Sequence, residues 1–215
     1  MTGKATIVSI TIALSSIIIL SNSRGKLIKS STNALSLIKH KKQINLYQYN
    51  KYPDIQNNTK KYLATFTVKT NTADLLSSLK NEAFAKQWIK SIKEYNHMTP
   101  ASENCWYTYM LFNIPWPFND QDCILKYSLL SCSDTSLHIK FESLPYHIPL
   151  NDKITRIKEF DGAWKFLKQT NSNTKAYFIM GSNTFTKNKI AESIILNTIV
   201  NSLATFREYS NEKVR

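Results

Sequence analysis

The residues that could carry chemistry are few, and they form no pattern typical of a catalytic or metal site. The four histidines are scattered, and none is spaced from another His, Cys or carboxylate as metal ligands are. The chain holds four glycines and contains no Gly-x-Ser-x-Gly elbow and no Gly-x-Gly-x-x-Gly loop. No paired carboxylates project from an apolar strand. We therefore expect no metal, no cofactor and no catalytic residue.

The cysteines and one aspartate are the remaining candidates. Cys105, Cys123 and Cys132 lack Cys-x-x-Cys spacing and fall in predicted strands, where cysteine is usually a small buried hydrophobe. A cross-strand disulfide between Cys105 and Cys123 is the alternative, and it would require an exported protein. Asp122 closes a turn, and there we expect it to accept backbone hydrogen bonds rather than to act in catalysis.

The stretch 109–122 joins two predicted strands through a proline-rich loop. Pro115 and Pro117 fix φ and remove two backbone donors, so a strand ladder cannot pass through them. The stiff loop should hold Trp116 and Phe118 in a fixed direction. Trp116 either folds back onto the core, as large aromatic residues commonly do, or it is exposed at a cavity mouth. In the second case Trp116 and Phe118 would enter a membrane interface.

Two segments resemble a known family. Residues 115–122, Pro-Trp-Pro-x-x-x-x-Asp, resemble the Trp-Pro-x-x-x-Arg-Asp signature of START domains. These are the lipid-transfer modules related to the steroidogenic acute regulatory protein, within the helix-grip superfamily. Residues 156–164, Arg-x-x-x-x-x-Gly-x-Trp, resemble the Arg…Gly-x-Trp segment of the same family, and the order of elements fits from Gln43 to Tyr209. The resemblance implies a cavity for one lipid or sterol and a lid that opens at a membrane.

The sequence departs from this family at three places. Gln121 stands where the family usually has arginine before the aspartate. Thr108 and Tyr127 stand at the approximate positions where some members place a charged pair inside the cavity. The segment 185–189, Phe-Thr-Lys-Asn-Lys, replaces the Gly-Gly-x-x-Pro turn that often precedes the last helix. The first two differences predict a less charged cavity, and the third bears on the geometry of the lid.

The first 42 residues are expected to lie outside the folded domain. Residues 1–23 combine Lys4, the uncharged run Ile7–Leu20 and the small residues 21–23, which is the pattern of a signal peptide. An uncleaved membrane anchor is the alternative, because basic residues follow at once. Residues 24–42 are polar and basic and are expected to form a linker, with at most a short helix.

The charge of the chain is strongly positive. The formal net charge is +13, and much of the excess lies before Tyr62. Such a segment is commonly only solvated, but it also attracts anionic lipid, by about 1 kcal/mol per basic residue near the surface. Charge alone would also allow nucleic-acid binding. No recognition motif accompanies the charge, so we expect a membrane surface and no nucleic acid as partner.

Hydrophobic periodicity predicts a mixed fold of strands and helices. Helices are predicted to begin at 71–74 and at 81, and a long apolar-striped helix spans 189–209. Asp161-Gly162 and residues 171–173 are predicted to form hairpin turns. Alternating apolar residues predict strands at 43–49, 61–69, 103–114, 123–131, 137–142, 154–160, 163–168 and 175–180.

Burial of the last helix then sets the fold class. A helix with one apolar face must lie across the antiparallel sheet that precedes it. We expect an α+β helix-grip fold over residues 43–210, in which a curved sheet wraps the C-terminal helix and encloses an apolar cavity. The predicted ligand-binding residues are Trp106, Thr108, Met110, Phe112, Leu125, Tyr127 and Phe141.

Two classes of function compete for such a cavity. The first is an exported, monomeric, non-enzymatic module that binds or transfers a lipid or another hydrophobic small molecule. The second is a cyclase or aromatase of the same superfamily, which would need polar residues that orient a substrate and move protons. The predicted lining offers only Thr108 and Tyr127 as polar points, which favours binding. A cell-envelope protein that uses the fold as a protein-interaction surface is a third possibility.

Overall fold

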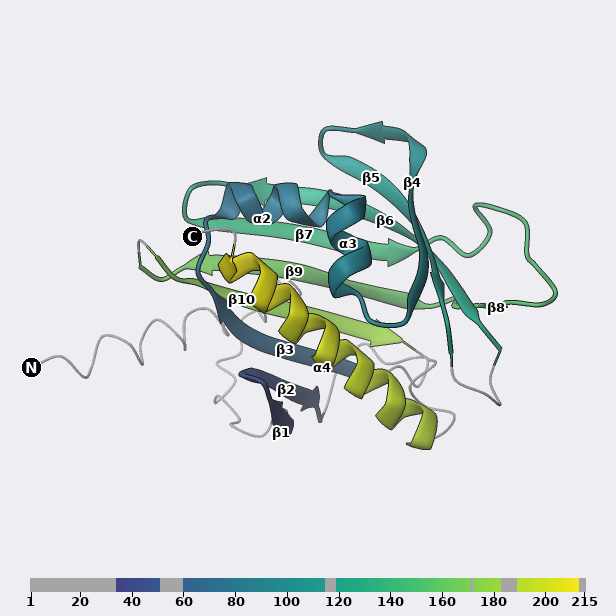
Figure 1. Cartoon of the computed structure of the whole chain (residues 1–215), viewed down its shortest axis with the longest axis horizontal. Coiled ribbons are helices and arrows are strands. Elements are labelled where there is room, and N and C mark those ends of the chain that lie inside the picture. Colours follow the sequence, from purple (N-terminus) through teal and green to yellow (C-terminus); the bar gives the residue numbers. More distant parts are fainter. Residues whose placement is uncertain (1–33, 51–59, 115–118, 171, 183–188, 213–215) are drawn as a thin grey trace, which may run out of the picture. The chain divides into compact units, whose positions relative to one another are not determined.

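The computed structural model describes residues 34–50, 60–114, 119–170, 172–182 and 189–212 (Figure 1). This part of the chain contains ten strands and three helices. The strands are β1 (Leu35–Lys41), β2 (Ile44–Tyr49), β3 (Lys60–Val68), β4 (Ile92–Ser102), β5 (Cys105–Phe112), β6 (Gln121–Cys132), β7 (Ser136–Ser143), β8 (Thr155–Arg156), β9 (Phe160–Lys168) and β10 (Thr174–Ser182). The helices are α2 (Thr72–Leu79), α3 (Glu82–Trp88) and α4 (Lys189–Glu212).

The strands form one antiparallel sheet in the order β1-β2-β3-β10-β9-β7-β6-β5-β4, and the short β8 pairs in parallel with β6. After β3 the chain crosses through α2 and α3 to the far edge of the sheet, and it then returns strand by strand to β10, beside β3. Figure 1 shows α4 running obliquely across the sheet, where it contacts β3, β2 and α3. The predicted α+β helix-grip arrangement is confirmed.

Both short helices begin where local capping residues predict. The Asn71 side chain accepts a hydrogen bond from the backbone N–H of Asp74 at 2.8 Å, and Asn81 does the same for Phe84 at 2.8 Å. Each cap satisfies one of the backbone donors that a helix start leaves without a partner. These two helices therefore start at positions that the sequence encodes locally.

Aromatic rings fasten α4 to the sheet. Phe206 lies 5.2 Å from Trp88 on α3, 5.4 Å from Trp164 on β9 and 6.2 Å from Phe66 on β3, measured between ring centroids. Phe206 and Phe66 are fully buried, and Trp164 is almost so. Aromatic pairs in such tilted or edge-to-face geometries add to the free energy gained by burial. The C-terminal half of α4 is thus held at the centre of the core, as its apolar stripe predicts.

Gly162 lies inside β9 and not in a hairpin turn, so the turn predicted at Asp161-Gly162 is wrong. A Cβ at this position would lie 2.0 Å from the Ile179 carbonyl oxygen and 2.5 Å from Cζ of Phe141. The absence of a side chain lets β9 pair with β10 while the Phe141 ring lies over it. Packing, and not turn geometry, therefore requires glycine here.

The structure also differs from the prediction at both edges of the sheet and in the segment before β9. β1 lies within 24–42, so the expectation of a linker or short helix there is wrong for Leu35–Lys41. β4 was not predicted, and it forms the opposite edge of the sheet. The strand predicted at 154–160 is reduced to Thr155–Arg156, and Phe160 begins β9. The predicted leader, residues 1–23, lies outside the described residues.

Candidate ligand-binding site

The seven residues predicted to line a cavity lie on three neighbouring strands and share one face of the sheet. Trp106 on β5 pairs with Tyr127 on β6, which pairs with Phe141 on β7. Thr108 pairs with Leu125 in the same way, and residues two apart along a strand point to the same face. Five of the seven are buried, and the remaining two, Phe112 and Tyr127, are partly exposed and pack against the core.

Stacked rings run along this face from strand to strand. The Trp106 and Tyr127 rings are 5.1 Å apart and nearly parallel, at 5°. Tyr127 lies 5.8 Å from Phe141, which in turn lies 5.7 Å from Phe178 on β10 and 5.3 Å from Phe160 on β9. The rings form a continuous apolar layer on this face of the sheet.

The helices that cover this face leave part of it accessible. Trp88 on α3 and Ile195 and Ile199 on α4 pack against the buried core but stay partly exposed. Phe112 and Phe160, which belong to the sheet, share this property.

Two buried indole nitrogens, Trp88 Nε1 and Trp106 Nε1, have no hydrogen-bond partner among the described residues. An unsatisfied buried donor or acceptor costs about 1–3 kcal/mol. An indole nitrogen is a donor only. A ligand that carries a carbonyl or hydroxyl group could satisfy these atoms.

Two tyrosine hydroxyls lie near Thr108. Burial raises the pKa of Tyr127 well above its ordinary value, and a hydrogen bond with the Thr108 hydroxyl opposes this shift. Burial likewise raises the pKa of Tyr95 on β4, and a hydrogen bond with Thr108 again opposes the shift. Both phenols therefore stay protonated at neutral pH and can donate hydrogen bonds. Tyr95 pairs with Met110 across β4 and β5, so the site extends to the sheet edge.

Asp122 forms a buried ion pair with Arg156, so the prediction that its partners are backbone groups is wrong. Arg156 Nε and Nη2 donate to the two carboxylate oxygens of Asp122 at 2.6 and 2.8 Å. The guanidinium also donates to carbonyl oxygens of the 145–149 loop, at 2.7 Å to Pro145 and at 3.3 Å to Ile148 and Pro149. The pair joins β6, β8 and this loop, and hydrogen bonding to Asp122 raises the pKa of Arg156.

The structure describes some, but not all, of the other residues for which the sequence predicted a role. Trp116 and Phe118, predicted to contact a membrane, lie outside the described residues. Cys105 pairs with Ser128 and Cys123 with Met110, so the alternative of a Cys105–Cys123 disulfide is wrong, and the cysteines are free. Within the described ranges, no group of three or more His, Cys, Asp or Glu residues could hold a metal ion. None of the helices described is long and apolar enough to cross a membrane.

Sequence reasoning missed three residues of this face. Tyr95 was missed because β4 was not predicted. Phe178 and Phe160 could have been found from strand alternation, since Phe178 belongs to the strand predicted at 175–180. The register that places Phe178 next to Phe141 depends on pairing across β9, which no local pattern encodes.

This combination of sheet, long C-terminal helix and apolar interior is the helix-grip fold, and solved structures of START domains share it. A STAR-related lipid transfer protein from Xanthomonas axonopodis superposes with a TM-score of 0.70 at 18% identity, covering 82% of this chain and 98% of that one. Human StAR-related lipid transfer protein 5 gives a TM-score of 0.70 at 6% identity, covering 99% of each chain. The chain therefore has the fold of START domains.

The same fold also occurs in an enzyme. The Zhui aromatase/cyclase from Streptomyces sp. R1128 superposes with a TM-score of 0.56 at 10% identity, covering 73% of this chain and 96% of that one. No protein-family model matches the sequence, and comparison with curated proteins finds no match. At such low identities, the structural likeness establishes the fold and leaves the activity to the residues of the site.

Proposed function

We propose that this chain is a non-enzymatic lipid-binding or lipid-transfer module that holds one hydrophobic ligand, a lipid or sterol-like molecule, between the sheet and the helices. The observation that carries the proposal is the buried indole donor Trp106 Nε1, which has no partner among the described residues and lies on an otherwise apolar face. Sites for small hydrophobic ligands combine such a face with a few polar groups that fix orientation. The two START structures described above carry lipid transfer in their names.

The pKa values of the tyrosine hydroxyls in the site favour ligand binding over catalysis. A cyclase or aromatase, the alternative that the Streptomyces structure supports, needs groups that exchange protons near neutral pH. Tyr95 and Tyr127 have raised pKa values, so their hydroxyls stay protonated. Thr108, the third hydroxyl, is a weak base. These groups can orient a ligand by hydrogen bonding, and none of the three is poised to abstract a proton.

Export and membrane contact complete the proposal. The pattern of residues 1–23 supports export to a periplasm, cell envelope or extracellular space, with a membrane anchor as the alternative. The net charge of +13 supports attraction to anionic membranes, and Trp116 and Phe118 would enter the headgroup region. We further propose that the protein acts as a monomer and binds no nucleic acid.

Tyr127→Phe tests the proposed site. The variant keeps the ring stacked on Trp106 and removes only the hydroxyl, so binding of a fluorescent sterol or phospholipid should weaken roughly three- to tenfold with little change in melting temperature. Tyr47→Phe is a matched control, because Tyr47 follows the inward-pointing Leu46 on β2 and faces the opposite side of the sheet. Equal losses of stability and binding in Tyr127→Phe would show an ordinary core residue and contradict the proposed role.

A further inference from the structure

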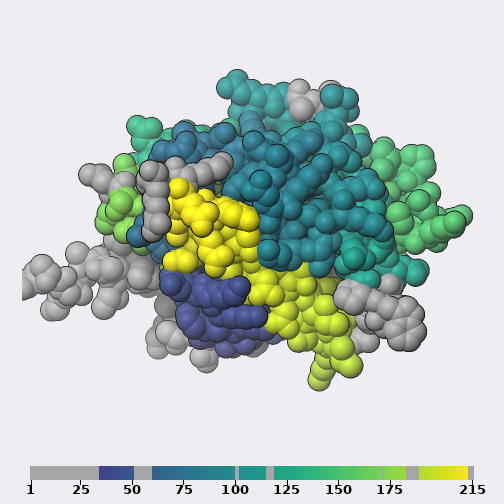
Figure 2. Space-filling model, viewed as in Figure 1, coloured from purple at the N-terminus to yellow at the C-terminus, as the bar shows by residue number. Residues whose placement is uncertain are grey.

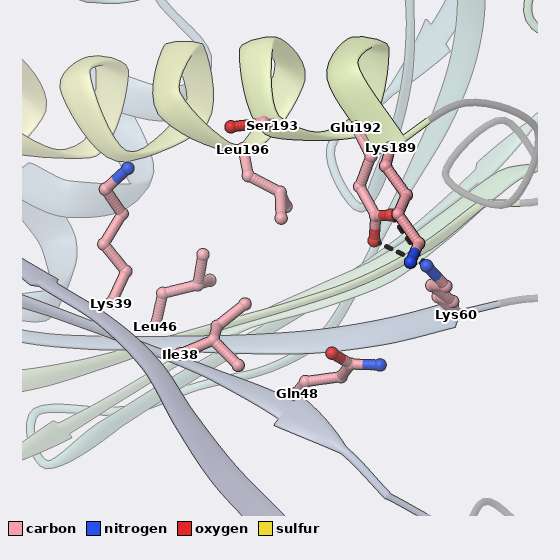
Figure 3. A pocket seen from close by; sticks show the side chains of 9 residues that line it. All are labelled: Ile38, Lys39, Leu46, Gln48, Lys60, Lys189, Glu192, Ser193 and Leu196. Atoms are coloured by element: carbon pink, nitrogen blue, oxygen red, sulfur yellow. Dashed lines mark hydrogen bonds and ion pairs between the residues drawn. The ribbon is translucent and has the colours of Figure 1, made fainter.

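A second pocket, of about 330 Å³, lies between the first three strands of the sheet and the N-terminal half of α4 (Figure 3). Figure 2 shows the surface of β1 and β2, in purple, directly against that of α4, in yellow. The pocket combines aliphatic side chains with lysines. Its lining residues are Ile38, Lys39, Leu46, Gln48, Lys60, Lys189, Glu192, Ser193 and Leu196.

Local backbone geometry explains how the pocket forms. Neighbouring residues of a regular strand point to opposite faces, but Ile38 and Lys39 both line the pocket. The pairing of β1 with β2 is irregular between Leu37 and Lys39, as at a β-bulge, and bulges change the direction of side chains. On α4, Lys189, Glu192 and Leu196 are spaced by three and four residues, so they share one helical face.

The charged ends and the apolar middle of the pocket are separate. Figure 3 shows Lys39 at one end and Lys60 and Lys189 at the other, with Ile38, Leu46 and Leu196 between them. Leu46 is fully buried and Leu196 nearly so, whereas 42% of Ile38 is exposed. The apolar part thus has both a buried wall and access to solvent.

The pocket carries more positive than negative charge. Lys60 forms an ion pair with Glu192 at 2.7 Å, and the Tyr62 hydroxyl donates to the same carboxylate. Lys39 donates to the side-chain oxygen of Asn197, which is neutral. The Lys189 side chain has no hydrogen bond or ion pair within the part of the chain that the structure describes. Three lysines and one glutamate therefore leave the lining net positive.

This pocket is separate from the proposed lipid site. Its strand residues come from β1, β2 and β3, whereas the ring-lined face belongs mainly to β5, β6 and β7. On α4 it uses Lys189, Glu192, Ser193 and Leu196, and neither Ile195 nor Ile199 lines it. The two sites can therefore be tested independently.

We propose that this pocket binds a small amphiphilic anion: a carboxylate or phosphate monoester on a short hydrocarbon chain. The anionic group pairs with Lys189 and Lys60, and the chain lies against Ile38, Leu46 and Leu196. Charge-assisted hydrogen bonds hold the head group, and apolar burial holds the chain. The volume is at the lower end of the range for small-molecule sites, so the pocket fits one short chain rather than a whole phospholipid.

Calorimetric titration of the full chain with four probes tests the proposal. Octanoate and octyl phosphate should bind, whereas 1-octanol, which lacks the charge, and inorganic phosphate, which lacks the chain, should bind roughly tenfold more weakly or not at all. Equal affinity for inorganic phosphate and octyl phosphate would overturn the amphiphilic part of the proposal. Equal affinity for 1-octanol and octanoate would overturn the anionic part.

Variants then place the binding in this pocket. Lys189→Gln should weaken octanoate binding roughly tenfold, and Lys153→Gln, a change of an exposed loop lysine, should leave it unaltered. Glu192→Gln should strengthen binding, because it removes the competing carboxylate while keeping a group that accepts from Tyr62. Ser193→Trp should block the pocket without changing charge. Unaltered binding in both Lys189→Gln and Ser193→Trp would refute the proposal.

The interior site serves as the comparison. Tyr127→Phe should leave octanoate affinity unchanged, since this residue does not line the pocket. If Tyr127→Phe weakens octanoate binding while Lys189→Gln does not, the anion occupies the interior, and the second site is refuted while the proposed function stands.

Discussion

Removing Arg156 should destabilise the protein strongly, because its guanidinium is the counter-charge of a buried carboxylate. The side chains of Arg156 and Asp122 are each 3% exposed. In Arg156→Met, the buried Asp122 carboxylate loses the hydrogen bonds at 2.6 and 2.8 Å, and the Pro145 carbonyl loses its donor at 2.7 Å. Breaking a buried ion pair on one side costs about 3–5 kcal/mol. For a domain of this size, the melting temperature should fall by roughly 6–20 °C.

A double-mutant cycle measures this coupling. The free energies of unfolding of Arg156→Met, Asp122→Asn and the double variant should be determined by urea denaturation. The double variant should lose less stability than the sum of the single variants, because each single change leaves one buried group unpaired. Asp120→Asn is a matched control: Asp120 pairs at 2.8 Å with Lys93, whose side chain is 55% exposed, and little stability should be lost. Additive losses, or losses no larger than the control's, would refute the argument.

Three further predictions follow from the fold and the sequence. Gly162→Ala should lower the free energy of unfolding by about 1–3 kcal/mol or more, because the new Cβ would overlap the backbone of Ile179. Gly181→Ala is the control, since its Cβ would meet only flexible side chains at 3.2–3.3 Å. Equal losses of stability in the two variants would contradict this prediction. Trp116→Ala should reduce co-sedimentation with anionic vesicles at unchanged melting temperature, and a loss of about 3–5 kcal/mol would instead place this ring in the core. N-terminal sequencing of the mature protein from its native host should begin shortly after Ser23, and a cytosolic protein that starts at residue 1 or 2 would contradict export.

Strong local signals made most of the fold predictable. Asn71 and Asn81 each cap a helix within three residues of chain, so their roles can be read without tertiary information. The alternation of Trp106, Thr108 and Met110 likewise identified the inward face of β5. These signals depend only on the spacing of residues along the chain, so they can be recognised without knowing the fold.

The missed strands are the two edges of the sheet, and this has a physical reason. β1 is mostly exposed, so it lacks the apolar alternation by which strands are recognised. β4 contains Pro100 and an irregular register between Met98 and Ser102, both of which an edge strand tolerates. Only pairing with neighbours β2 and β5 makes these segments strands.

Contacts between residues far apart in the sequence could not be predicted from local patterns either. The ion pair of Asp122 with Arg156 spans 34 residues, although the family resemblance had drawn attention to both. Tyr95 joins the candidate site only through β4, and the second pocket needs β1, β3 and α4 together. The site residues on β5, β6 and β7 were therefore predictable from the sequence, whereas the extent of the site over the neighbouring strands was not.

Native mass spectrometry of the purified chain, followed by organic extraction and identification of released molecules, tests the central claim most directly. A lipid-binding module should carry one hydrophobic molecule per chain, and Tyr127→Phe should carry it at lower occupancy than Tyr47→Phe. A chain that stays empty after purification and after incubation with host lipid extract would contradict the account.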